Sequence, residues 1–364
     1  MRRSLGTLAA MLCAVLVSVV AGGCGPVPSA VDAPPVAAAA QALSSTAGPA
    51  QPSGFTVRNA GLFVRVDGLP GRWRVATRIY RPRGRVTHRA IQLLVHGATY
   101  DGRYWEIPAI NGVSYSYAEA MASRGYEVVV MDQLGAGASD HPDGDAFGLT
   151  QAAQVLQEVG AQVRRRSGPH RALVYVGHSN GSVTALYSQG TYQGADGVVT
   201  TGWVHGYRPL PVDPSDPVFQ EALAHPYISL PGAARAGLFY YAPEVDPDVV
   251  AYDNAELNTA MPRRQFLDLL AVHGDIAARG PGGMTEATRS QEVRVPVLVQ
   301  AGEEDFAIAP ASTVDQPPTE EAFFPNAPSV DVEVLPEIGH AVNGHRTHAE
   351  SWDGIDGWLQ SRFD

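Results

Sequence analysis

The chain contains no lysine, since all 26 of its basic residues are arginine. This absence excludes an enzyme that forms a Schiff base through lysine, a P-loop nucleotide-binding site and a serine–lysine catalytic dyad. If a serine acts as a nucleophile in this chain, its base must therefore be a histidine. The formal net charge is −11. A chain this acidic lacks the electrostatic footprint of a nucleic-acid-binding protein, and we expect no nucleic-acid partner.

Cysteine is almost as scarce, with two in the whole chain, Cys13 and Cys24. Cys13 lies inside an apolar run, residues 5–20, which two arginines precede and small residues follow. The run is too short and too close to the N-terminus for a membrane-spanning helix. We interpret residues 1–23 as a signal peptide and expect the protein to be exported.

The residues before Cys24 resemble a bacterial lipobox, in which the cysteine becomes the lipidated first residue of the mature protein. They read Ala21-Gly22-Gly23 and lack the leucine that is usual three places before the cysteine. A lone cysteine in the mature chain cannot form an internal disulfide, whereas lipidation would give it a role. We expect the protein on the outer face of the cell membrane, touching the membrane only through a lipid anchor at Cys24. The alternative is a secreted protein whose signal peptide is cleaved near Ala21.

The rest of the chain divides into three kinds of sequence. Residues 24–54 are rich in Ala, Pro and Ser, have too little to bury, and indicate a disordered tether. From residue 55 onward, β-branched runs alternate with helical stretches, which is typical of an α/β fold with a mostly parallel twisted sheet flanked by helices. Residues 206–292 differ, because prolines are frequent, strands are not evident and aromatic residues gather. We predict that they form a helical cap inserted into a core of residues 55–205 and 293–364.

The expected elements of the core follow from hydrophobic periodicity. The predicted strands and helices are an opening hairpin (61–66 and 72–80), strands 91–95, 127–131, 173–176, 197–205, 293–300 and 330–335, and helices 117–124, 150–166, 182–187 and 352–363.

One strand ends in the motif Gly177-His178-Ser179-Asn180-Gly181. A serine between two glycines directly after a strand sits on a sharp turn that raises its hydroxyl above the sheet. The residues that follow can form a helix, whose amino end favours a developing negative charge. Ser179 is therefore a candidate nucleophile.

Two later strands also end in polar residues. Residues 293–300 lead to Asp305, and residues 330–335 lead to Gly339-His340. Reactive groups collect at the carboxyl ends of strands in open α/β sheets, so Asp305 and His340 are candidates for an acid and a base. The competing acids are Glu303 and Glu304, and the competing histidines are His345 and His348.

A serine, an acid and a histidine in this chain order, each at a strand end, make the chain resemble the α/β-hydrolase superfamily. Two further pieces match its pattern: His96-Gly97 after an early strand, and Asp132-x-x-Gly135-x-Gly137-x-Ser139 after the next. The resemblance covers nearly all of residues 55–364 outside the insertion. In this superfamily the Asp132 motif is usually a structural turn, and Gln133 here replaces the common arginine.

The resemblance implies roles for five residues. Ser179 would attack the substrate, His340 would take its proton, and Asp305 would fix the imidazole tautomer. The backbone N–H groups of Ala98 and Asn180 would hold the oxyanion. We interpret His178, the residue before Ser179, as a packing residue.

The substrate is less constrained by the sequence. Tyr100 and Trp105 follow the His-Gly segment and would line a substrate pocket, with core packing as the alternative. The aromatic insertion favours an enclosed pocket for a small to medium apolar ester or lactone. We expect no cofactor and no metal, because no acid or cysteine spacing accompanies the C-terminal histidines. The alternatives are an amidase or exopeptidase on the same triad, a non-hydrolytic reaction such as elimination, and a catalytically inactive surface binding protein.

Overall fold

The computed structural model describes residues 54–168, 171–205, 217–279, 285–305 and 320–364. The expected signal peptide (1–23), the lipidation site Cys24 and the expected tether up to residue 53 lie outside the described residues. Within the described ranges, no helix combines the length and the apolarity needed to cross a membrane.

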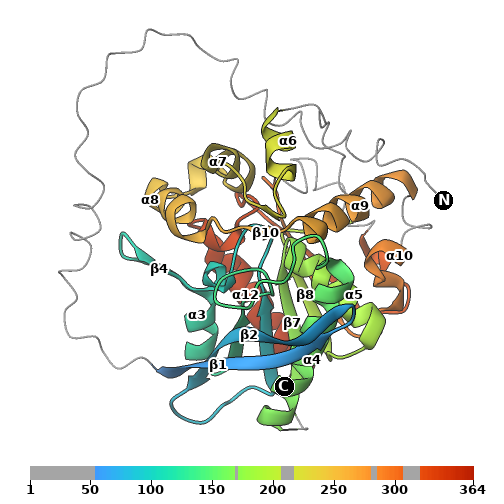
Figure 1. Cartoon of the computed structure of the whole chain (residues 1–364). Helices are drawn as coiled ribbons and strands as arrows, with labels where there is room; N and C mark the ends of the chain where they lie inside the picture. Colours follow the sequence, from blue (N-terminus) through green and yellow to red (C-terminus); the bar gives the residue numbers. More distant parts are fainter. Residues whose placement is uncertain (1–53, 169–170, 206–216, 280–284, 306–319) are drawn as a thin grey trace.

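An eight-stranded sheet forms the centre of the molecule (Figure 1). Its strands lie in the order β1-β2-β6-β3-β7-β8-β11-β12, and all neighbours from β6 to β12 are parallel, whereas β2 runs antiparallel to both of its neighbours. The predicted mostly parallel sheet is therefore confirmed. The strands are β1 (Phe55–Val66), β2 (Leu69–Pro82), β3 (Ala90–Val95), β6 (Glu127–Met131), β7 (Ala172–His178), β8 (Gly197–Thr201), β11 (Val297–Gly302) and β12 (Val330–Leu335).

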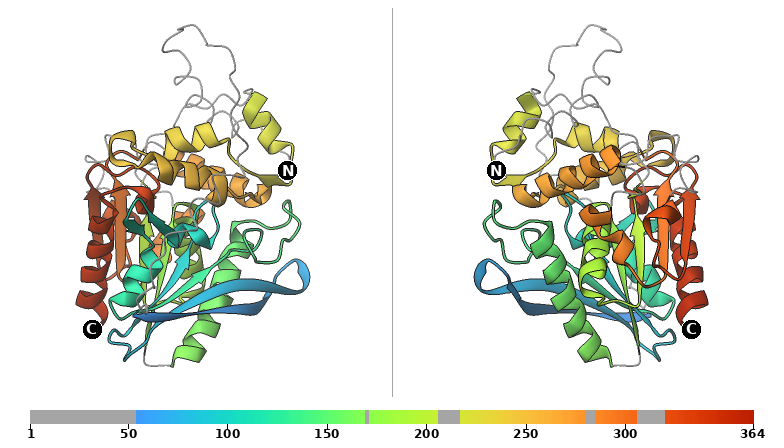
Figure 2. Two further views of the ribbon diagram at one scale, coloured as in Figure 1. Left: turned by 90° about the vertical axis from the view of Figure 1, so that its left-hand side faces the viewer. Right: turned by 90° about the vertical axis from the view of Figure 1, so that its right-hand side faces the viewer.

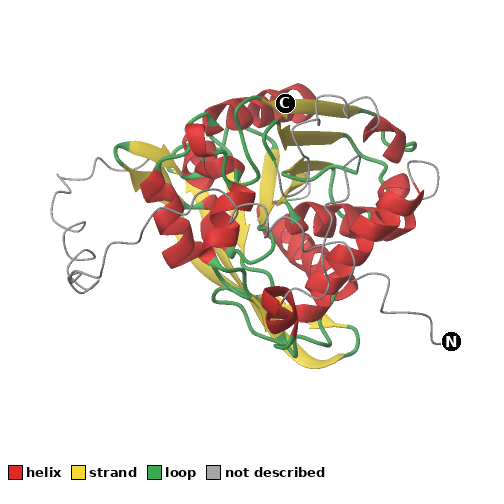
Figure 3. Cartoon of the chain, turned by 90° about the horizontal axis from the view of Figure 1, so that it is seen from above, coloured by secondary structure: helices red, strands yellow, loops and turns green. Residues whose placement is uncertain are grey.

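Helices cover both faces of the sheet, as the view from above shows (Figure 3). Helices α4 (Leu149–Ser167) and α5 (Asn180–Tyr192) pack into one apolar cluster, and α3 (Tyr117–Ser123) and α12 (His348–Phe363) pack into another. Central strands buried on both faces need continuous apolar runs, and every residue of β3 is buried. In α4, buried residues recur at helical spacing, and the helix ends before Gly168, whose φ is +98°.

Several boundaries differ from the prediction, among them the start of β1, at Phe55 instead of 61, and the extent of α5, Asn180–Tyr192 instead of 182–187. Strand β8 ends at Thr201 instead of 205, because Gly202 turns the chain with a φ of +59°. Strand β11 begins at Val297 instead of 293, because a 3-10 turn over Ser290–Glu292 and Pro296 precede it. The last helix begins four residues earlier than predicted, at His348.

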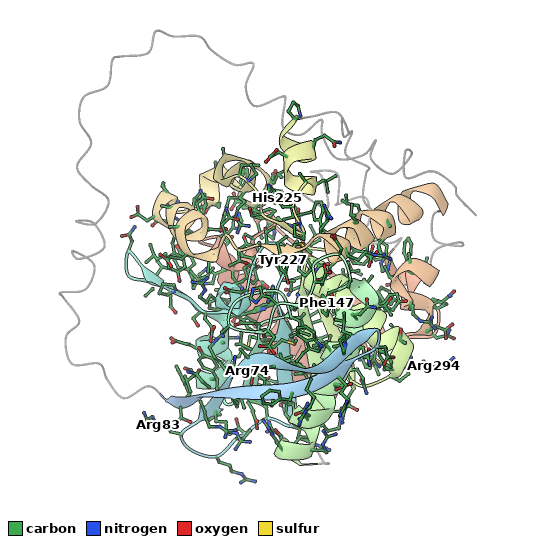
Figure 4. The ribbon with its side chains drawn as sticks, viewed as in Figure 1. Arg74, Arg83, Phe147, His225, Tyr227 and Arg294 are labelled. Carbon is green, nitrogen blue, oxygen red and sulfur yellow. The ribbon has the colours of Figure 1, made fainter. Side chains whose placement is uncertain are left out.

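The described residues between 217 and 292, here called the cap, lie above the carboxyl ends of the strands (Figure 2). The cap contains two paired strands of two residues each, β9 and β10, which the sequence did not indicate. Tyr227 lies where the cap meets the core, and its hydroxyl donates to the carbonyl of Pro142 at 2.6 Å (Figure 4). The cap elements are α6 (Pro217–Leu223), β9 (Tyr227–Ile228), α7 (Gly232–Phe239), α8 (Pro247–Tyr252), the π-helix η4 (Asp253–Leu257), β10 (Met261–Pro262), α9 (Arg263–Arg279) and α10 (Thr285–Thr288).

Candidate active site

Ser179 occupies a strained turn between β7 and α5. Its φ is +52° and its ψ is −120°, in a region that non-glycine residues seldom adopt and that costs about 1–3 kcal/mol. A Cβ on Gly177 would lie 2.6 Å from the backbone of Gly181, and a Cβ on Gly181 would lie 2.2 Å from the carbonyl oxygen of Val95. Only glycine fits at both positions, so the motif is required by the turn itself. The Ser179 N–H donates to the carbonyl of Thr201 at 2.8 Å, which ties the turn to β8.

The structure brings the three candidate residues together from three strand ends. His340 Nε2 lies 2.9 Å from Ser179 Oγ, and His340 Nδ1 lies 2.9 Å from Asp305 Oδ2. Their exposed fractions are 5% for Ser179, 2% for His340 and 0% for Asp305. A carboxylate can only accept hydrogen bonds, so Nδ1 carries the proton and the Nε2 lone pair faces the serine hydroxyl. This is the tautomer that a general base needs.

The competing histidines do not contact Ser179 but support the loop that carries His340. His345 Nε2 accepts the N–H groups of Gly339 and Tyr241, both at 3.0 Å, and His345 Nδ1 lies 3.0 Å from the carbonyl of Ala341. Burial lowers the pKa of His345 to about 4, so the ring stays neutral and keeps its acceptor nitrogen. His348 packs on the ring of Trp352, with 4.2 Å between centroids.

The two expected oxyanion donors flank the serine. A Cβ on Gly97 would lie 3.1 Å from the Ser179 Cβ, so the loop that contains Ala98 passes directly beside Ser179. Asn180 is the first residue of α5, where backbone N–H groups have no intrahelical acceptor. Among the described residues, neither the Ala98 N–H nor the Asn180 N–H meets an acceptor. Both groups are free to donate to a substrate oxygen.

Two other sequence candidates have structural contacts. Asp132 accepts the N–H groups of Gly102 at 3.0 Å and Ala138 at 2.9 Å, as expected of a turn residue. His178 stacks on Tyr104 with 4.2 Å between ring centroids. Burial lowers the pKa of His178 well below its ordinary value, so the ring is a neutral packing group.

The structure buries both residues that were expected to line a substrate pocket. Tyr100 and Trp105 are each 1% exposed and belong to the apolar cluster beneath the site. The Tyr100 hydroxyl donates to Asp253 at 2.8 Å, and Trp105 packs on Tyr117. These contacts match the core-packing alternative, and a role in substrate binding stays a prediction.

A groove of about 640 Å³ lies between the cap and the core. It is lined by Tyr227 and Thr259 from the cap and by Arg78, Asp101 and Asp132 from the core, among others. The N–H of Thr259 donates to the carbonyl of Thr99 at 3.0 Å, so a residue that lines the groove contacts the residue after Ala98. In the described part of the chain, no three His, Cys, Asp or Glu side chains are grouped as a metal site would need.

Two buried groups escaped the sequence analysis. The first is Arg235 of α7, which pairs with Asp253 and donates to Thr99. Thr99 lies on the loop of residues 96–100, here called the oxyanion loop after the role expected of Ala98. Partners 18 and 136 positions away leave no local pattern that would have revealed Arg235.

The second group is another serine–histidine–carboxylate arrangement, whose histidine lies in the segment that follows β8. His205 Nε2 lies 2.8 Å from Ser290 Oγ, and His205 Nδ1 lies 2.9 Å from Glu320 Oε2. Ser290 is 0% exposed, and the ring of His205 stacks on Phe323 with 4.3 Å between centroids. Its three members come from segments with no shared motif.

The fold and the Ser179 site together define an α/β hydrolase. The family model described as serine aminopeptidase, S33, matches residues 110–346, and the chain belongs to this family. The resemblance to the α/β-hydrolase superfamily is thereby confirmed. No curated protein sequence matches the chain.

Solved structures share the fold at low sequence identity. A thermostable carboxyl esterase from Bacillus coagulans is 18% identical with a TM-score of 0.59, covering 84% of this chain and 98% of its own. A monoglyceride lipase from Saccharomyces cerevisiae is 15% identical with a TM-score of 0.58, covering 85% and 96%. A monoacylglycerol lipase from Paleococcus ferrophilus is 19% identical with a TM-score of 0.54, covering 80% and 99%. At these identities the likeness shows the fold.

Proposed function

We propose that the protein is an exported serine hydrolase that cleaves a carboxylic ester or lactone of a small to medium apolar molecule through an acyl-enzyme. The observation that carries the proposal is the hydrogen-bonded chain from Ser179 through His340 to Asp305, with Ser179 on a strained turn at the amino end of a helix. The esterases and lipases among the solved structures with this fold support an ester as the substrate.

The reaction proceeds in two halves. In the first, Ser179 Oγ bonds to the substrate carbonyl carbon while His340 Nε2 takes the hydroxyl proton, and the N–H groups of Ala98 and Asn180 hold the resulting oxyanion. The tetrahedral intermediate then loses its alcohol, which receives the proton from His340. In the second half, water adds to the acyl-enzyme with His340 again as base, and the acid leaves as Ser179 regains its proton.

The family description makes aminopeptidase activity the second candidate. Such an enzyme needs a carboxylate to bind the free amino group of its substrate. The four buried aspartates are already paired: Asp305 with His340, Asp253 with Arg235, and the groove residues Asp101 and Asp132 with Arg103 and Arg78. Glu303 and Glu304, both partly exposed in the turn after β11, are the carboxylates that would serve this role. The pairing of all four buried aspartates with other side chains favours esters over peptides.

Labelling with a fluorophosphonate tests the enzyme against the alternative of an inactive binding protein. We expect rapid covalent labelling of the wild type and none of Ser179→Ala, and an unlabelled wild type would favour the binding protein. Rates on p-nitrophenyl esters of graded length and on aminoacyl anilides then separate the two hydrolases. Faster turnover of anilides that drops in Glu303→Gln or Glu304→Gln would favour the aminopeptidase.

Export and anchoring are tested separately in a bacterial host. We expect the full chain to be processed before residue 24, to partition into detergent and to be exposed on the cell surface. Cys24→Ala should be released from the membrane fraction, and equal partitioning of both proteins would contradict lipidation. These proposals concern localisation and do not depend on the chemistry at Ser179.

A further inference from the structure

Thr99, the residue after the oxyanion donor Ala98, has an unfavourable backbone conformation. Its φ is +54°, a region in which a β-branched residue is a genuine outlier. Thr99 is fully buried, so water cannot satisfy its polar groups. The surrounding structure must therefore hold this conformation.

Arg235 supplies that hold from the cap. Its Nη1 donates to the Thr99 carbonyl at 3.1 Å and lies 2.6 Å from the Thr99 hydroxyl. The same carbonyl accepts the N–H of Thr259 at 3.0 Å, which also belongs to the cap. The Thr99 end of the oxyanion loop is thus bound by cap residues.

The guanidinium of Arg235 is itself fixed on every side. Asp253 pairs with it through Nε, at 3.1 Å, and through Nη2. The rings of Tyr100 and Phe239 lie 4.4 and 5.0 Å from its Cζ. Burial and Asp253 raise the pKa of Tyr100 well above its ordinary value, so the Tyr100 hydroxyl stays protonated and donates to Asp253. A buried ion pair adds little net stability. What the Arg235–Asp253 pair provides is a fixed position for the guanidinium.

The other end of the loop is bound in a different way. Gln133, in the core, donates its backbone N–H to His96 Nε2 at 3.0 Å and its side-chain amide to the His96 carbonyl at 2.8 Å. Gln265 of α9 in turn donates to Gln133 at 3.2 Å. The core therefore holds the His96 end of the loop, and the cap contacts that end through Gln133. At Thr99, by contrast, cap residues bond to the loop directly.

We propose that Arg235, anchored by Asp253, is a positioning residue that holds Thr99 in the left-handed conformation and thereby aims the Ala98 N–H at the developing oxyanion. The inference rests on the proposed function. If Arg235 has this role, α7 contributes to the catalytic site itself and does not merely cover it. Losing this support should impair the transition state more than the ground state, and so lower kcat more than it raises KM.

The test compares two arginines of the cap. Arg235→Met removes the support, and Arg263→Met is the matched control, because Arg263 makes a two-pronged but partly exposed pair with Asp145 of the core. With p-nitrophenyl butyrate we expect Arg235→Met to lower kcat about 10-fold to 100-fold with KM changed less than about threefold, since losing an oxyanion donor outright costs more. Affinity for a trifluoromethyl ketone, which mimics the tetrahedral intermediate, should fall in parallel. Arg263→Met should leave kcat, KM and that affinity within about threefold of wild type.

A rescue variant tests whether the effect passes through Thr99. Asparagine adopts left-handed φ more readily than threonine, so Thr99→Asn in the Arg235→Met background should recover kcat at least about threefold. No recovery would overturn the inference. Circular dichroism and thermal unfolding check that the variants fold. If Arg235→Met does not fold, Asp253→Asn, which keeps the side-chain volume but removes the anchoring charge, should show the same fall in kcat without a rise in KM.

The outcomes separate this inference from the proposed function. Wild type that is neither labelled by a fluorophosphonate nor active would overturn both. Wild type that is labelled, beside a folded Arg235→Met with unchanged kcat, would overturn the positioning role alone. A rise in KM with unchanged kcat would also overturn it, because it would assign Arg235 to substrate binding.

Discussion

Two serine–histidine–carboxylate arrangements with nearly the same hydrogen bonds occur in this chain. In the Ser179 relay (Ser179, His340 and Asp305) both bonds measure 2.9 Å, and in the Ser290 relay (Ser290, His205 and Glu320) they measure 2.8 and 2.9 Å. All six side chains are largely buried. The hydrogen bonds alone therefore do not distinguish a catalytic site from a structural one.

The surroundings of the two serines distinguish them. Ser179 has a positive φ, retains 5% exposure and precedes a helix of 13 residues. Ser290 is 0% exposed, begins a 3-10 turn of three residues, and its hydroxyl also bonds to Thr288 at 2.6 Å. Glu320 accepts both the ring and the backbone N–H of His205, so it fixes the chain after β8. We therefore expect the Ser179 relay to be the catalytic one, because its serine combines a strained backbone, some exposure and neighbouring N–H groups that meet no acceptor in the described part of the chain.

The largest expected difference follows from removing each hydroxyl. Ser179→Ala should lower kcat/KM by about 10⁴-fold or more, because no nucleophile remains. Ser290→Ala should leave kcat/KM within about threefold and lower the free energy of unfolding by about 1 kcal/mol through the lost hydrogen bond. Ester hydrolysis and chemical denaturation measure the two effects. A catalytic loss in folded Ser290→Ala would break the comparison.

The carboxylates extend the same contrast. Asp305→Asn should lower kcat about 10³-fold to 10⁴-fold with little change in KM, because the amide favours the wrong tautomer of His340. Glu320→Gln should instead cost about 1–3 kcal/mol of stability, with kcat close to wild type under folding conditions. Equal losses of kcat in the two variants, with both still folded, would mean that the Ser290 relay is coupled to the chemistry.

The sequence was sufficient to predict the members of the Ser179 relay. Each of them follows a strand, and parallel strands bring their carboxyl ends to one edge of the sheet. Asp305 and His340 were found this way, although Glu303 and His345 lay within a few residues of them. The Ser290 relay and Arg235 were missed because their partners come from segments without periodicity or motif. The short strands β9 and β10 were missed for a similar reason, since two residues are too few to show alternation.

His345, which supports the loop that carries His340, makes the stability of the protein sensitive to acid. Its pKa in the folded protein, about 4, lies below the ordinary 6.5, so its contribution to stability is complete above pH 6.5 and is lost as the pH falls toward 4. The loss is on the order of 3 kcal/mol. We expect His345→Gln to be less stable than wild type at pH 7 and to lose less stability between pH 6.5 and 4.

Urea unfolding at several pH values measures this effect. His225→Gln is the control, because His225 is exposed on the cap and pairs with an equally exposed side chain, Glu221. Burial also lowers the pKa of His178, so the wild-type loss is expected to exceed the share of His345. An identical pH dependence in wild type and His345→Gln would contradict a neutral His345 as the support of the His340 loop.

The smallest expected effect concerns the side chain next to the nucleophile. Asn180 is 2% exposed, and its buried Oδ1 has no hydrogen-bond partner among the described residues. If only its backbone N–H serves the oxyanion, Asn180→Ala should keep kcat within about threefold and change stability by less than about 1 kcal/mol, because no side-chain bond is lost. A fall in kcat of more than about tenfold in folded Asn180→Ala would instead assign the oxyanion donor to the Asn180 side chain.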